Sequence, residues 1–199
     1  MASVIAHGQD SVHERLRRAT AEQHRRLDRG LGYVLTADLS VDRYANLLAA
    51  FFGFYAPLED ELMRRQAEAP VLPLIRRADL LHRDLLALDR TPDAIPLCAD
   101  LPGLLPLART AGAIYVIEGA SLGGQVIARA VRQLGVGPEN GGAFFTGDGV
   151  RTGARWRQVL SWLDAVDRDR GASGEMVAAA CETFGAITRW LQARRVLDE

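Results

Sequence analysis

Residues Tyr115 to Gln125 read YVIEGASLGGQ and place three glycines inside a long apolar segment, about Pro106 to Leu134, that is typical of a helix. A glycine inside a helix costs roughly 1 kcal/mol relative to alanine, because its backbone loses more entropy on ordering. The stretch therefore indicates a need for bare backbone. Charged residues nearby exclude a transmembrane dimer motif. Close packing of two helices and a ligand lying flat on the backbone both remain open.

The chain on both sides of this stretch shows the same helical spacing of apolar residues, with no run of alternating apolar and polar residues. We predict a single all-α domain over residues 11–199, preceded by a flexible N-terminus, residues 1–10. The first helix should begin with a capping box from Ser11 to Glu14, and Thr152 is expected to cap a later helix. Predicted helices cover residues 11–29, 40–66, 73–90, 106–134, 152–169 and 173–195.

Composition and charge exclude several classes of protein. The 199 residues carry a formal net charge of -1, which argues against a nucleic-acid partner, and all 24 basic residues are arginine. Cys98 and Cys181 lie far apart and have no spacing typical of a metal site or disulfide framework. No apolar run suits a signal peptide or a membrane span. We expect a soluble, cytoplasmic protein without a membrane partner.

Histidines are the candidate metal ligands. His24 stands at the edge of the apolar stripe of the first helix, and His13 projects from nearly the same side three turns earlier, so periodicity does not choose between them. Asp79 and His82 have the spacing of half a di-iron helix pair, but no second half follows. A triad hydrolase is equally unsupported, because the chain has no GxSxG turn.

Three stretches, taken together, resemble the heme oxygenase family. LRRATAEQHRRLD is similar to its first helix, in which a histidine four residues after a threonine binds the heme iron. VDRYANLLAAFFGFYAPLEDEL resembles the helix that follows, and YVIEGASLGGQVIAR resembles the distal helix. The details EGxxLGG and TGxxW, the latter at Thr152 to Trp156, are most similar to bacterial heme oxygenases that supply biliverdin to bacteriophytochromes.

This resemblance implies that heme lies between the first helix and a kinked, glycine-containing distal helix. His24 would bind iron through its outer ring nitrogen, while an acceptor that the sequence does not identify holds the other nitrogen. Gly119 and Gly123 would bring bare backbone against the porphyrin, and Gly124 would relieve packing at the kink.

The resemblance also assigns partners for the heme edges. Arg17, two turns before His24, stands where the family places a basic residue, and Tyr115 lies one turn before Gly119. Arg155 or Arg157 would add a second positive charge. Phe184 would pack either on the heme edge or in the core.

One position departs from the mammalian pattern. Mammalian relatives have an aspartate directly after the first distal glycine, where this chain has Ala120 followed by Ser121. Bacterial relatives also lack that aspartate, so activity is not excluded. Ser121 or the backbone is then the candidate anchor for the distal water.

The implied reaction is oxidative cleavage of heme, both substrate and cofactor, to biliverdin, carbon monoxide and ferrous iron with O2. Because the chain has no flavin, nicotinamide or iron-sulfur motif, electrons would come from an external ferredoxin or reductase. The first alternative is a heme-binding or carrier protein of the same fold. The second is a helical relative that degrades thiamine, which would require a placed catalytic cysteine.

Overall fold

All regular structure in the computed structural model is helical within residues 10–68 and 72–198, the ranges that the structure describes. This confirms the all-α prediction. Residues 1–9 of the expected flexible N-terminus lie outside these ranges. The α-helices are α1 Val12–Gly30, α2 Val41–Glu68, α3 Arg77–Ala87, α4 Leu107–Ala130, α5 Ala143–Thr146, α6 Thr152–Arg170 and α7 Ser173–Ala193. Short 3-10 helices are η1 Gly32–Leu35, η2 Pro92–Ala94, η3 Val131–Leu134 and η4 Gly149–Arg151.

Two predicted helix starts have opposite outcomes. The capping box of α1 is confirmed, since the backbone N–H of Glu14 donates to Ser11 Oγ and the Glu14 carboxylate accepts from the Ser11 N–H. The predicted cap at Thr152 is wrong. Thr152 is already the first residue of α6, and its buried Oγ1 has no hydrogen-bond partner among the described residues.

Helix α3 begins later than its local pattern predicts because its cap comes from another helix. The carboxylate of Glu59 in α2 accepts the backbone N–H of Arg77 at 3.0 Å and that of Ala78 at 2.9 Å. Burial raises the pKa of Glu59 to about 7, although these two hydrogen bonds oppose the shift. A cap that is 18 residues away leaves no local signal in the sequence.

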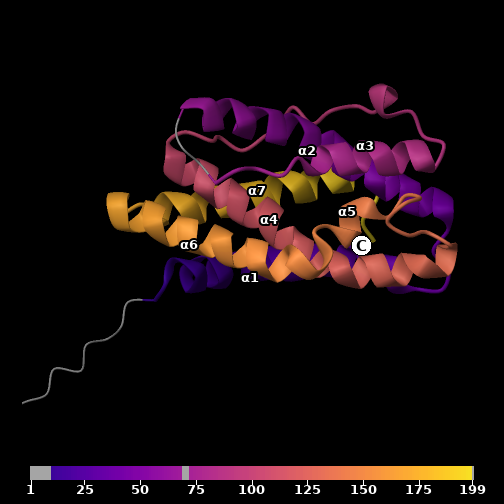
Figure 1. Ribbon diagram of the computed structural model, residues 1–199, viewed down its shortest axis with the longest axis horizontal. Helices are drawn as coiled ribbons and strands as arrows, with labels where there is room; N and C mark the ends of the chain where they lie inside the picture. Colours follow the sequence, from indigo (N-terminus) through magenta and orange to yellow (C-terminus); the bar gives the residue numbers. More distant parts are fainter. Residues whose placement is uncertain (1–9, 69–71, 199) are drawn as a thin grey trace, which may run out of the picture.

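The helices are arranged with α4 and α7 in the middle, α2 and α3 on one side, and α1 and α6 on the other (Figure 1). By length and composition alone, the segment Leu107–Leu134 is apolar enough to cross a membrane, but more than half of it is buried inside the protein. The same apolarity is typical of the central helix of a globular core.

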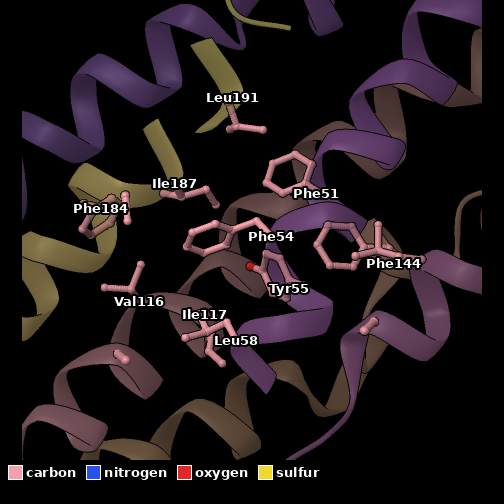
Figure 2. Packing of buried hydrophobic residues seen from close by; sticks show 14 of the residues in the cluster. Phe51, Phe54, Tyr55, Leu58, Val116, Ile117, Phe144, Phe184, Ile187 and Leu191 are labelled. Carbon is pink, nitrogen blue, oxygen red and sulfur yellow. The ribbon is translucent and has the colours of Figure 1, made fainter. Parts of the chain in front are cut away.

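The backbones of α4 and α7 approach closely at a glycine outside the YVIEGASLGGQ stretch. A Cβ built on Gly112 would lie 2.2 Å from the carbonyl oxygen of Met176. Aromatic side chains of α2 fill the space beside this pair, with Phe54 and Tyr55 packed among aliphatic residues of α4 and α7 (Figure 2). Gly112 is therefore the packing glycine of the central helix pair.

Candidate functional site

His24 presents an exposed imidazole whose orientation is fixed on one side. Its Nδ1 lies 2.8 Å from the carboxylate of Asp28, one turn further along α1, and the side chain is 56% exposed. The ring also meets the edge of Phe184 of α7, with the ring centroids 5.7 Å apart. Because Asp28 holds Nδ1, Nε2 is the nitrogen that remains for a metal. Sequence reasoning missed Asp28, although its spacing of four residues is a readable signal.

His13 lies in a different environment at the other end of the same helix. Its ring centroid is 5.9 Å from that of Trp156 in α6 and 6.3 Å from that of Tyr115 in α4. The eleven residues that separate the two histidines correspond to about 16 Å along a helix. The structure thus distinguishes a histidine held by a carboxylate from one set among aromatic rings, a distinction that periodicity leaves open.

One face of α4 is uncovered beyond Glu118. Leu122 is 43% exposed and Val126 is 47% exposed, although both are large apolar residues. A Cβ built on Gly123 would meet nothing within 4 Å, whereas one on Gly119 would touch the Trp156 ring at 3.4 Å. Contiguous exposed apolar surface on a core helix marks a place where a ligand or partner binds.

Ser121 and Gly124 face away from this surface. Ser121 stands roughly 200° around the helix from Gly119, and its buried hydroxyl donates to the carbonyl oxygen of Glu118 at 2.6 Å. A Cβ on Gly124 would come within 3.0 Å of the Phe145 carbonyl oxygen, so Gly124 permits close packing of α5. Ala120, by contrast, is exposed.

The α1 side of the site is a stripe on one helix face, formed by His13, Arg17, Thr20 and His24. Arg17 is exposed, while Thr20 is buried and its hydroxyl donates to the Leu16 carbonyl oxygen at 2.8 Å. Burial raises the pKa of Tyr115 above its ordinary value, against the opposing effects of Thr20 and the Arg17 charge. The charge of Arg17 thus acts on the Tyr115 hydroxyl.

The two helices that carry these residues run in the same direction. The ring of His13, near the beginning of α1, lies beside Tyr115 of α4, and η1, which follows α1, also packs against α4. Just beyond both helices, Gln133 donates its side-chain N–H to the Thr36 carbonyl oxygen at 2.9 Å. Between these two points, α1 packs on α7 and α6 rather than on α4.

A buried charge cluster borders the uncovered face, about 100° around α4 from Gly119. Glu118 and Arg77 of α3 are each 3% exposed, and Arg77 Nη2 is 3.1 Å from Glu118 Oε2 and 3.3 Å from Asp148 Oδ2. Arg155 of α6 also binds the Glu118 carboxylate, through Nε at 3.2 Å. Burial lowers the pKa of Arg77, but the Glu118 charge and hydrogen bond outweigh it and the net pKa is raised. The structure thus places Arg155 in a buried ion pair rather than on the open side of the site.

These features define a helical protein with a carboxylate-held histidine on α1 and an uncovered apolar face on α4. No group of three or more His, Cys, Asp or Glu side chains is placed to hold a metal ion in the described part of the chain. A sequence model of the heme oxygenase family matches residues 10–102 and 105–193. The chain belongs to the heme oxygenase family, and this membership supports binding and degradation of heme.

Two solved structures share the fold at low sequence identity. The NO- and CO-bound heme oxygenase of Neisseria meningitidis superposes with a TM-score of 0.74 at 20% identity, covering 94% of this chain and 92% of that one. The heme oxygenase of Leptospira interrogans gives a TM-score of 0.73 at 20% identity, covering 92% of this chain and 100% of that one. No match was found among curated proteins.

Proposed function

We propose that this protein cleaves heme oxidatively to biliverdin, carbon monoxide and ferrous iron, with O2 and electrons from an external donor. The observation that carries the proposal is His24, whose exposed ring is held through Nδ1 by Asp28 and so offers Nε2 to iron. When bound, heme supplies both the iron that binds dioxygen and the ring that is oxidised. Every other requirement falls on the side chains and backbone of the protein.

The proximal side has to hold one ligand in one orientation. The Asp28 carboxylate selects the ring tautomer with the proton on Nδ1 and makes Nε2 a stronger donor. The edge of Phe184 restricts rotation of the imidazole. His24 is therefore pre-oriented, which lowers the entropic cost of binding iron.

The distal side has to let a flat ring approach a helix closely. The bare backbone at Gly119 and Gly123 permits this approach, and the exposed side chains of Leu122 and Val126 offer apolar contact to a porphyrin. The three glycines of YVIEGASLGGQ then have different roles. We assign Gly119 and Gly123 to the ligand, of which Gly123 is open and Gly119 lies beside the Trp156 ring, while Gly124 packs against α5.

The heme propionates need cations or hydroxyl donors at one end of the site. We assign this task to Arg17, whose side chain is exposed, and to Tyr115, on which the Arg17 charge acts. Arg155 is a weaker candidate than the sequence alone indicates, because Glu118 already binds its guanidinium. Arg157 on the same helix is exposed and is the better second cation.

Protons have to reach the oxygen that binds on the distal side. Since Ser121 is turned away and already donates to Glu118, we infer that backbone groups around Gly119 and Ala120 anchor the distal water. The exposed Ala120 leaves room for such a water where mammalian relatives carry an aspartate.

The cellular setting rests on the sequence resemblance alone. EGxxLGG and the TGxxW segment favour supply of biliverdin to a bacteriophytochrome, with a ferredoxin or a reductase as electron donor. We place the enzyme in the cytoplasm, with the apolar segment Leu107–Leu134 as its core helix rather than a membrane span.

The test is a hemin titration of wild-type protein, His24→Ala and His13→Ala, followed by reductant, catalase and air with chromatography of the pigment. We expect wild type and His13→Ala to form a histidine-ligated complex and release biliverdin, and His24→Ala to lose that ligation. A lost histidine spectrum in His13→Ala alone would move the ligand to His13. Wild-type protein that binds heme but leaves the ring intact would favour the carrier function.

A further inference from the structure

The carboxylate of Glu118 has no task in the proposed chemistry, yet arginines from two other helices bind it. Arg77 comes from α3, Arg155 from α6, and Asp148, which also binds Arg77, from the segment between α5 and η4. Two positive and two negative charges balance, which makes their burial tolerable. Asp148 reaches Arg77 because the glycines on both sides of it adopt φ values of +54° and +56°, which only glycine adopts readily.

The position of this cluster in the chain ties it to the site. Glu118 directly precedes Gly119, and Arg155 directly precedes Trp156. The Trp156 ring is in turn the nearest group to the Cβ position of Gly119, at 3.4 Å. Gly119 of α4 and Trp156 of α6 thus face each other, and the residues directly before them, Glu118 and Arg155, form an ion pair. This ion pair sets the spacing of α4 and α6 at that point.

We propose that Glu118 is a positioning residue for the distal face. Its ion pairs with Arg77 and Arg155 hold the backbone of Gly119 at a fixed separation from the Trp156 ring. This separation limits how far a porphyrin enters at that end of α4, and so determines which edge of the ring lies beside the bound oxygen. The effect on a porphyrin rests on the proposed function, whereas the spacing between Gly119 and Trp156 does not depend on it.

The network has little capacity to rearrange when Glu118 is neutralised. Nη1 of Arg77 is buried and already lacks a hydrogen-bond partner within the described residues. In Glu118→Gln the amide oxygen remains a hydrogen-bond acceptor, but Arg77 keeps only the charge of Asp148 and Arg155 loses the negative charge that orients it. Two guanidinium groups with one carboxylate repel each other, so α3 and α6 should shift relative to α4.

The experiment compares Glu118→Gln with Asp84→Asn, a matched control. Asp84 is also a buried carboxylate, 1% exposed, but it accepts the backbone N–H groups of Ala143 and Phe144 and has no contact with Glu118. Three readouts are taken: the Gly119 amide resonance in the apoprotein, the C–O stretching band of the ferrous carbon monoxide complex, and the ratio of biliverdin isomers. Arg155→Gln, which keeps the Arg77–Glu118 pair, serves if Glu118→Gln does not fold.

Both variants should lower the melting temperature, but only the change at Glu118 should move the Gly119 resonance, shift the C–O band and alter the isomer ratio. Glu118→Asp should give an intermediate result. An unchanged resonance, band and ratio in Glu118→Gln, or equal changes in Asp84→Asn, would overturn the inference. Wild-type protein that does not bind heme would instead refute the proposed function, and the apoprotein resonance would still test the positioning role.

Discussion

Replacing Gly123 by alanine should stabilise the apoprotein while weakening heme binding. A Cβ at this position meets nothing within 4 Å, so no contact opposes the gain in helix propensity. That gain is about 1 kcal/mol, which corresponds to a rise in melting temperature of roughly 2–4 °C for a domain of this size. The stabilised residue lies on the uncovered face of α4, where the added methyl group projects toward the proposed ligand.

The matched control is Gly112→Ala in the same helix. Its Cβ would lie 2.2 Å from the Met176 carbonyl oxygen and 2.9 Å from the Ala179 Cβ, so α4 and α7 would have to separate. Overpacking of this kind costs on the order of 3 kcal/mol, which outweighs the gain in propensity. Replacing glycine by alanine in α4 should therefore raise the melting temperature at position 123 and lower it at position 112.

The measurements are thermal unfolding without heme, followed by hemin titration. If heme lies against Gly123, the methyl group costs about 1–3 kcal/mol of binding free energy, or roughly 10- to 100-fold in hemin affinity. A Gly123→Ala protein that unfolds earlier than wild type would show that the face is covered in solution. Unchanged hemin affinity in a stabilised variant would refute the placement of heme on this face.

Two further predictions concern carboxylates. The pKa of Glu59 is about 7 in the folded protein against 4.5 for a free glutamate, so the folded state holds the extra proton between these values and loses stability as pH rises through that window. Relative to Glu59→Gln, wild type should lose about 3 kcal/mol of unfolding free energy between pH 4.5 and 7 and no more above it, and parallel stability curves would contradict this account. Asp28→Asn should weaken the donor strength of His24 and lower hemin affinity about tenfold. Resonance Raman of the ferrous complex should show a lower iron–histidine stretching frequency, and an unshifted band would remove Asp28 from the site.

Much of the fold could be predicted from apolar spacing, because a helix that packs on a core has to repeat its apolar residues every three or four positions. The α1 capping box was predictable for the same reason, since both of its partners lie within one turn. The start of α3 was not, because its cap comes from Glu59 in another helix. At Thr152 the local signal was misleading. The residue type suits a helix cap, but α6 begins at Thr152 itself, so Thr152 is the first helical residue and not the cap before it.

Local sequence is enough to specify most of the long helices, the carboxylate one turn beyond His24, and the need for bare backbone at YVIEGASLGGQ. Those features depend on neighbours within a few residues, where backbone geometry fixes which side chains meet. Tertiary structure decided that Gly124 packs while Gly123 stays open, and that Arg155 is bound by Glu118, 37 residues away. The reason is physical. The sequence of a helix determines which residues share a face, but only the packing of other helices determines which part of that face is covered.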